Sequence, residues 1–298
     1  QDLDLYVVSG GSVFHIDSSV YQDRLYLNDG QGNFTLDSLA LPYTAFSGAF
    51  VRPHDMDNDG DLDLLVGGRV TPGQYPKTPP TVLLRNQNGT FESVTEQWAP
   101  QLARWGMMTD AEWVNVVGDE QKELVVVGEW LPISIWQWEN GRLEPIDTKG
   151  LSHSNGWWNC LEAGDFDQDG DIDFLVGTLG LNSNHQADSR RPLCLYAHDF
   201  DGNGKVDPIL CHFVDGKEYP VASRDAFLKQ LAKKKKIFQD YQSYANATIQ
   251  EVLTQEELQN AQVLRSYQYA SCYLENKGEG NFDLQALPWQ MQMAPITD

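Results

Sequence analysis

Residues 165–173 read DFDQDGDID and run directly into the apolar segment FLVGT at 174–178. Aspartates occupy alternate positions in this stretch, and a glycine stands at its sixth place, where the chain can turn sharply. The segment that follows is short and apolar, which is typical of a buried strand. Residues 55–63 (DMDNDGDLD), followed by LLVGG, repeat the whole pattern. The chain is therefore predicted to consist of repeats, each with an acidic loop that leads into a strand.

Three further stretches are variants of this loop. Residues 199–207 (DFDGNGKVD) keep the pattern ahead of PILCHF, and residues 2–4 (DLD) look like the back half of such a loop. Residues 115–123 occupy the corresponding place but carry Val117 at a ligand position and Glu120 instead of the glycine. We therefore expect no metal on the 115–123 loop.

A second module recurs as a strand, a turn and another strand. Its turns combine Asn, Gly and Asp between apolar or aromatic runs, as β-hairpins do. A loop and a hairpin together make one antiparallel unit, recurring about every 50–60 residues, which suits the blades of a β-propeller. A β-helix would need a shorter period, and a sandwich would not explain acidic loops at matching places. The hairpins are 24–36 (RLYLNDGQGNFTL), 81–94 (TVLLRNQNGTFESV), 133–146 (ISIWQWENGRLEPI) and 272–284 (CYLENKGEGNFDL).

The predicted fold class is all-β, a β-propeller segment that extends over residues 1–298 with about four or five blades, and thus part of one ring. Residues 222–263 break the rhythm, because they are rich in Ala, Leu, Gln, Lys and Glu. Thr254 and Glu257 fit a capping box there. We expect about two or three helices inserted between strands of a blade, as a packed cover over one end rather than a dedicated partner-binding module.

Alternating carboxylates are the pattern from which a short loop can supply calcium ligands, since calcium takes about six to eight oxygens. In the first loop Asp55, Asp57 and Asp59 would offer side-chain oxygens, Asp61 its backbone carbonyl, and Asp63 would close the site. Without a cation the crowded carboxylates would repel one another. We expect about three Ca²⁺ ions. The candidate ligands are Asp55, Asp57, Asp59, Asp61, Asp63, Asp165, Asp167, Asp169, Asp171, Asp173, Asp199, Asp201, Asn203, Lys205 (through its carbonyl) and Asp207.

An EF-hand loop begins with the same spacing but needs a glutamate at its twelfth position and a helix on each side. The twelfth positions here are Val66, Val176 and Leu210, and the flanking segments read as strands. The EF-hand alternative is therefore rejected. A turn that binds no metal remains the other interpretation, and it is strongest for the 199–207 loop.

The formal net charge of −22 disfavours nucleic acid as a partner, because phosphate binding needs clustered Lys and Arg. The basic run at 233–236 is interpreted as a solvated helix face. No apolar run approaches the length of a membrane span. Cys194 and Cys211 would face each other in a hairpin, either as a disulfide or as two buried thiols.

The loops D-x-D-x-D-G-D-[LI]-D and the hairpins L-x-N-x-x-G-x-F resemble FG-GAP/VCBS repeats, the blades of integrin α-like propellers. Longer stretches, such as GWWNCLEAGDFDQDGDIDFLVGTLGLNS, are similar to the bacterial ASPIC/UnbV group related to cartilage acidic protein. The resemblance implies an integrin-like propeller with calcium on its blade loops, in a protein that is secreted, periplasmic or on the cell surface. It implies the same ligands on the three acidic loops named above.

The favoured function is a binding or adhesion scaffold for a protein or glycan ligand, not an enzyme. Loops 152–158 and 179–191, with Arg69, Trp130 and Trp136, are candidate contact surfaces, although each Trp fits a blade core better. The alternative is a calcium-assisted polysaccharide lyase or glycosidase on a propeller. For that chemistry His54, His153 and His185 are the histidines in loop-like contexts, and no recognised catalytic motif accompanies them.

Overall fold

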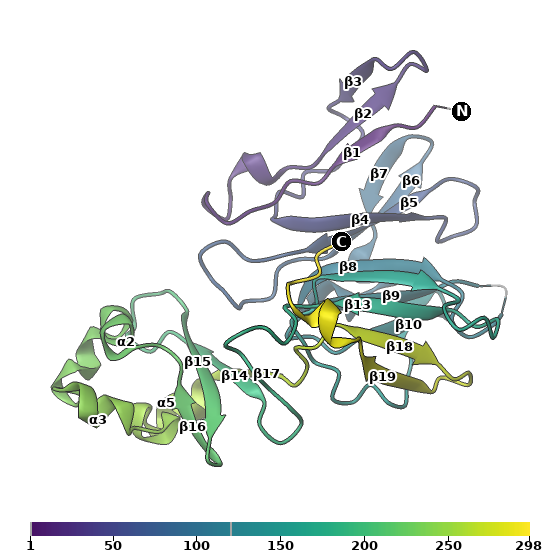
Figure 1. Cartoon of the computed structure of the whole chain (residues 1–298). Helices are drawn as coiled ribbons and strands as arrows, with labels where there is room; N and C mark the ends of the chain where they lie inside the picture. The colour runs from purple at the N-terminus through teal and green to yellow at the C-terminus, as the bar shows by residue number, and fades with distance from the viewer. Residues whose placement is uncertain (1, 120) are drawn as a thin grey trace.

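Four antiparallel sheets lie one after another in a row in the computed structural model, which describes residues 2–119 and 121–298 (Figure 1). Each sheet combines one acidic-loop module, or its variant, with one hairpin module. The first has three strands, β1 (Leu5–Val7), β2 (Arg24–Asn28) and β3 (Phe34–Asp37). The second has four, β4 (Gly48–His54), β5 (Asp63–Gly68), β6 (Val82–Gln87) and β7 (Thr90–Ser93).

The next two sheets repeat the four-stranded arrangement. In each, the first two strands are joined by an acidic loop or its variant, and the last two by a hairpin turn. The third sheet has β8 (Met107–Val114), β9 (Glu123–Glu129), β10 (Ser134–Glu139) and β11 (Arg142–Pro145). The fourth has β12 (Cys160–Gly164), β13 (Asp173–Gly177), β18 (Cys272–Asn276) and β19 (Phe282–Ala286).

The core lies between successive sheets. Leu65 and Leu83 of one sheet share a buried cluster with Leu124 and Trp136 of the next, and Val125 and Phe174 belong to a second cluster one step further along the row. This stacking of four-stranded sheets confirms the all-β, propeller-like prediction. Three complete blades and the three-stranded sheet make four, within the expected range.

The insertion is larger than the sequence indicated. Between β13 and β18 the described chain forms a further sheet in the order β16-β15-β14-β17. The 199–207 loop joins β14 to β15 and therefore lies in the inserted sheet, not on a blade. The strands are β14 (Leu193–His198), β15 (Asp207–Val214), β16 (Lys217–Pro220) and β17 (Gln262–Ser266).

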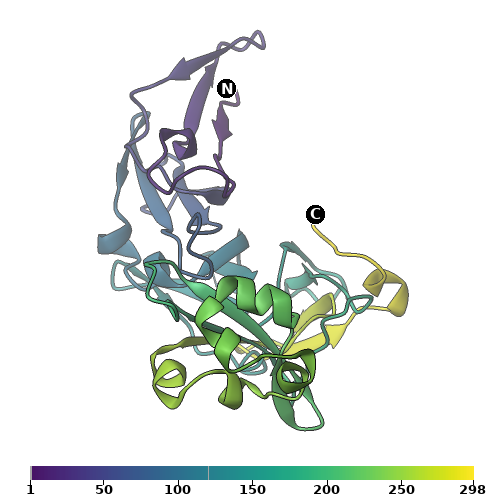
Figure 2. The ribbon, with the colours of Figure 1, turned by 90° about the vertical axis from the view of Figure 1, so that its left-hand side faces the viewer.

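Helices are present as expected, but residues 222–263 form five short helical segments and not two or three. They connect β16 to β17 of the inserted sheet and not two strands of a blade. The fourth strand, β17, pairs back with β14, and this long-range pairing could not be read from local periodicity. Phe227, Tyr244 and Ile249 pack on the face of β14 and β15, which the helices cover (Figure 2). The helices are α2 (Arg224–Gln230), η3 (Ala232–Lys236), α3 (Tyr241–Ala245), α4 (Ile249–Val252) and α5 (Gln255–Asn260).

Three details of the insertion test the sequence interpretation. Thr254 and Glu257 form the expected capping box. The basic run is not entirely solvated, because Lys234 is buried and its Nζ lies 2.6 Å from Glu257 Oε2. Cys194 and Cys211 lie opposite each other on β14 and β15 as buried free thiols.

The remaining short helices are α1 (Thr95–Trp98), η1 (Ser19–Tyr21), η2 (Leu102–Arg104) and η4 (Trp289–Gln292). Across the described residues, every helix is too short or too polar to cross a bilayer.

Candidate metal centres

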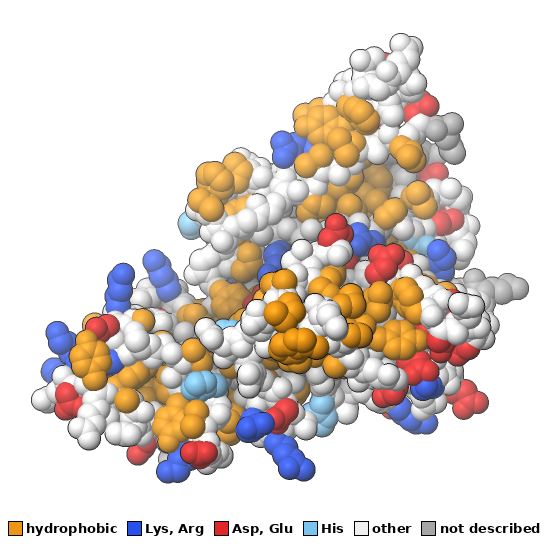
Figure 3. Space-filling view, in the orientation of Figure 1, with side chains coloured by type: hydrophobic (Ala, Val, Ile, Leu, Met, Phe, Trp, Pro, Cys, Tyr) orange, Lys and Arg blue, Asp and Glu red, His pale blue; other side chains and the backbone are white. Residues whose placement is uncertain are grey.

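The two acidic loops of the blades occupy equivalent places in the row of sheets. Residues 55–63 connect β4 to β5, and residues 165–173 connect β12 to β13. Figure 1 shows β4 and β8 running toward the same edge, and acidic side chains gather on that edge in Figure 3. The third acidic loop lies apart from these two, in the inserted sheet.

Each acidic loop brings three carboxylates together. One oxygen from each member of a group lies within 4.8 Å of the others, a spacing that could hold a metal ion. The first, third and ninth positions of the loop supply these groups. The groups are Asp55, Asp57 and Asp63; Asp165, Asp167 and Asp173; and Asp199, Asp201 and Asp207.

The remaining candidate ligands lie in the turn of each loop. Asp59 Oδ1 accepts a hydrogen bond from the Asp61 backbone N–H at 3.0 Å, and Asp169 and Asp171 repeat this contact at 2.9 Å. In the third loop the amide oxygen of Asn203 accepts from Lys205 N at 2.8 Å. Gly60 and Gly170 have φ of +96° and +99°, which permits the turn. The ligand role of these fifth- and seventh-position residues stays a prediction.

The ninth-position aspartate is the best-buried carboxylate of each loop. Asp63 and Asp173 are 0% exposed. Asp63 Oδ2 accepts from Met56 N at 2.9 Å, which holds the loop, and Oδ1 accepts from Asn86 N of β6 at 2.8 Å. Burial is the largest influence on this carboxyl and raises its pKa. The ninth aspartate therefore joins the acidic loop to the third strand of its own blade.

The asparagine that donates to this aspartate recurs in three of the sheets, and the sequence analysis missed its role. Asn276 N donates to Asp173 at 2.9 Å, and Asn28 N donates to Asp4 at 2.9 Å. The side-chain oxygens of these asparagines in turn accept from backbone N–H groups in the hairpin turns. The signal was the Asn that stands at or next to the end of the first strand in three of the four hairpins. We call this aspartate–asparagine contact the clamp.

The clamp of the last blade reaches a neighbouring sheet. Asn276 is 1% exposed, and its Nδ2 donates to Val116 O, in the 115–123 loop that follows β8, at 3.0 Å. One asparagine thus binds the metal loop, its own hairpin and the adjacent blade.

Calcium fits the donor set of these loops. Every group consists of carboxylate oxygens, the ligands that hard cations prefer. Both side-chain oxygens of Asp57 are buried without a hydrogen-bond partner among the described residues. The cation beside them is Arg85, whose Nη2 lies 2.7 Å from Asp57 Oδ2 without hydrogen-bond geometry.

The two blade loops differ in one neighbouring charge. The residue that precedes the clamp asparagine is Arg85 in one blade and Glu275 in the other. Arg85 pairs with Asp57, whereas Glu275 is close enough to Asp167 to contribute to raising the pKa of that carboxyl, after the larger effect of burial. Glu275 is itself paired with Lys277. The two loops therefore differ chiefly in the arginine that pairs with Asp57 of the first loop.

The 115–123 loop uses its polar groups internally. Glu123 is 2% exposed, and its Oε2 accepts from Val116 N and Val117 N at 2.7 and 3.2 Å. Asn115 Oδ1 accepts from Gly118 N at 2.7 Å. Glu120, where the glycine was expected, lies outside the described residues. Glu123 thus holds its own loop through backbone N–H groups, as the ninth-position aspartate Asp63 does in the first acidic loop.

The proposed contact residues divide into core and surface. Trp130 and Trp136 are buried at 3% and 0% exposure, so they are not contact residues. Arg69 pairs with Glu129 at 2.9 Å. The three candidate catalytic histidines contact aromatic rings: His54 stacks on Trp113, His153 contacts Tyr267, and His185 contacts Trp157.

A family model described as FG-GAP-like repeat matches residues 1–66 and 115–176. These segments contain the first acidic loop, the 115–123 variant and the 165–173 loop. No curated protein matches the chain.

The buried side chain of Asn276 predicts a stability effect that does not depend on metal. Asn276→Ala removes hydrogen bonds to Val116 and Gly278 from a buried site, and we expect it to lower the free energy of unfolding by about 1–3 kcal/mol. Lys277→Ala, at the exposed neighbour, should change it by less than about 1 kcal/mol. Urea unfolding at saturating EDTA measures both. Equal effects of the two substitutions would contradict this structural role of the Asn276 side chain.

The charge difference predicts an order of calcium affinity. The 165–173 loop should bind Ca²⁺ more tightly than the 55–63 loop, because Arg85 opposes a cation at the latter. Arg85→Gln should tighten the weaker site by about tenfold, and Glu275→Gln should weaken the tighter one. Calorimetric calcium titrations of the two variants and the unmodified chain measure this. The prediction fails if either substitution shifts affinity in the opposite direction.

Proposed function

Since the chain is an FG-GAP-repeat protein, we propose that it is a calcium-stabilised propeller scaffold that binds a protein or glycan outside the cytoplasm, and that it is not an enzyme. The observation that carries the proposal is the recurrence of one carboxylate group at the same three positions in three separate loops. An ion that stabilises each loop in the same way needs carboxylate ligands at the same loop positions, so this recurrence is expected for a structural ion.

The chain's own residues explain how an ion would stabilise this scaffold. The first- and third-position carboxylates face the buried ninth aspartate, so like charges are held close together. A bound Ca²⁺ would supply the positive charge that offsets this repulsion. Because Asp63 and Asp173 also accept from the third strand of their blades, rigidity gained at the loop is passed to the hairpin.

Binding is favoured over catalysis by the surroundings of the histidines. A general base needs to lie within hydrogen-bond reach of the proton it removes. His54 and His185 instead contact indole rings, and burial lowers the pKa of both. The propeller blades supply a rigid support, and the long 179–191 loop extends from it as a contact surface.

Removal of calcium should destabilise the folded chain. An ion held at about 100 times its Kd adds about 2.7 kcal/mol to folding, so we expect excess EDTA to lower Tm by roughly 5 °C or more. Calorimetry in calcium and in EDTA measures the shift.

The control variants for this shift keep the clamp intact. Asp57→Asn and Asp167→Asn alter carboxylate groups without touching Asp63 or Asp173, and together they should abolish most of the EDTA effect. Glu123→Gln should leave it unchanged. A Tm that is the same with and without calcium would contradict the proposal.

The enzyme alternative makes a different prediction. A calcium-assisted lyase would convert uronic-acid polysaccharides into unsaturated products, whereas a scaffold leaves them intact. We expect no increase in ultraviolet absorbance when the calcium-loaded chain is incubated with polygalacturonate, alginate or hyaluronan. Sustained product formation that is lost in a His54→Ala or His153→Ala variant would show that the chain is a lyase.

A further inference from the structure

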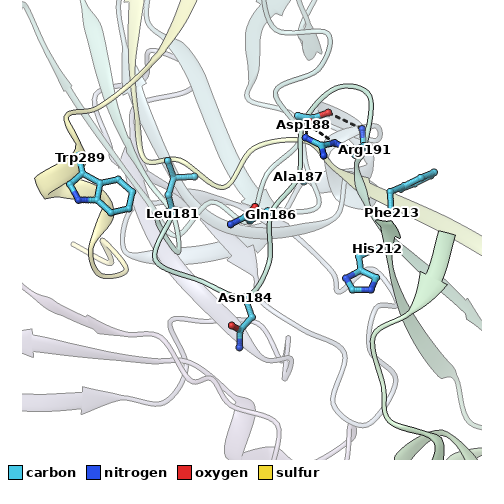
Figure 4. A pocket seen from close by; sticks show the side chains of 9 residues that line it. All are labelled: Leu181, Asn184, Gln186, Ala187, Asp188, Arg191, His212, Phe213 and Trp289. Atoms are coloured by element: carbon cyan, nitrogen blue, oxygen red, sulfur yellow. Dashed lines mark hydrogen bonds and ion pairs between the residues drawn. The ribbon is translucent and has the colours of Figure 1, made fainter. Parts of the chain in front are cut away.

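A groove of about 540 Å³ lies between the inserted sheet and the C-terminal segment. One wall is the 179–191 loop, another is β15, and the third is η4. Figure 4 shows Trp289 at one side of the hollow and Phe213 with His212 at the other, while Leu181 and Gln186 lie between them. The groove therefore exists because the insertion stands beside the last blade.

The walls of the groove are held from behind. Gln292 is 1% exposed; its Oε1 accepts from Ser271 N, and its Nε2 donates to Ser271 O, each at 2.9 Å. Its backbone oxygen accepts from Asn182 N at 3.1 Å, and Asn182 Nδ2 reaches Met293 O at the same distance. Helix η4 and the loop are thus fastened to each other. A site of this kind is largely formed before a ligand arrives.

The far end of the loop is closed by an ion pair. Arg191 Nε and Nη2 both donate to Asp188 Oδ2, at 3.0 and 2.7 Å. Their backbone groups also exchange hydrogen bonds. The charges of this carboxylate and guanidinium offset one another, so the groove has little net charge although the chain as a whole carries −22.

Trp289 is the residue that most strongly indicates a ligand-binding site in this groove. Its side chain is 59% exposed at the rim of the groove, whereas the chain buries Trp98, Trp130 and Trp136 in its cores. An aromatic face beside amides is the arrangement that sugars require, since a pyranose ring presents apolar C–H groups on its face and hydroxyls at its edge. Asn184 and Gln186 supply amides beside it.

We propose that this groove binds a neutral oligosaccharide, with one sugar ring against Trp289 and hydroxyls on the amides of Asn184 and Gln186. This inference rests on the proposed function as a binding scaffold and names its ligand class. Acidic glycans are disfavoured, because the strongly negative chain repels polyanions and Arg191 is already paired. A protein partner is disfavoured by shape, since protein interfaces of standard size are broader than this hollow.

The test uses electrophoresis of the calcium-loaded chain through native gels that contain a polysaccharide. Gels with xylan, galactomannan, mixed-linkage glucan or starch provide neutral probes, and gels with polygalacturonate provide the acidic one. We expect at least one neutral polysaccharide to retard the chain and polygalacturonate not to do so. The matching hexasaccharide, titrated by calorimetry, then gives the affinity.

Variants connect the retardation to the groove. Trp289→Ala should weaken binding at least tenfold, Trp289→Phe should restore part of it, and Asn184→Ala with Gln186→Ala should weaken it further. Tyr43→Ala, at an aromatic side chain that is 72% exposed on another part of the surface, should change nothing.

Three results would overturn the proposal: no retardation by any neutral probe, retardation by polygalacturonate alone, or equal retardation of the Trp289→Ala variant. Failure of the groove is separable from failure of the scaffold. A chain that keeps its calcium-dependent Tm but binds no neutral glycan refutes only the groove, whereas loss of the calcium response refutes the scaffold.

Discussion

The contact on which the rest of this structure depends is the one between the last aspartate of an acidic loop and the backbone N–H of the hairpin asparagine. In two blades it joins Asp63 to Asn86 and Asp173 to Asn276, and each aspartate is fully buried. A buried carboxylate is costly unless its oxygens accept hydrogen bonds. For Asp63 those hydrogen bonds come from Met56 in the loop and Asn86 of the third strand. For Asp173 they come from Tyr273 and Asn276, both of the third strand. The cost of burial is therefore offset by connections that define the blade.

The same carboxylates repel one another because they are held close together, and a cation would offset this repulsion. A loop with aspartates at alternate positions can be neutral only if positive charge is brought to it. In the 55–63 loop Arg85 brings part of it, whereas Glu275 adds negative charge beside the 165–173 loop. Two repeats with nearly identical loops therefore differ in how much of their negative charge is paired within the chain, because of one residue on the neighbouring strand.

The insertion uses the propeller as a support. Its sheet and helices have their own core, and its first strand, β14, is closed by β17 rather than by a blade. Its second contribution is the hollow beside η4, to which β15 brings His212 and Phe213 while the last blade brings Trp289. Neither part contains the groove alone. The acidic loops join strands within the blades, and the irregular 179–191 segment lines the groove.

Local pattern determined much of this protein. The spacing of aspartates and of hairpin turns predicted the all-β fold, the acidic loops and the repeat unit, because side chains within nine residues meet whatever the rest of the chain does. The capping box at Thr254 and Glu257 was predictable for the same reason. Tertiary structure alone decided the pairing of β17 with β14, the burial of Lys234 and the hidden role of Asn276. It also decided that the 179–191 loop faces Trp289 across a groove. These depend on which distant segments pack together, and that choice follows from the burial of whole surfaces, which no short stretch of sequence specifies.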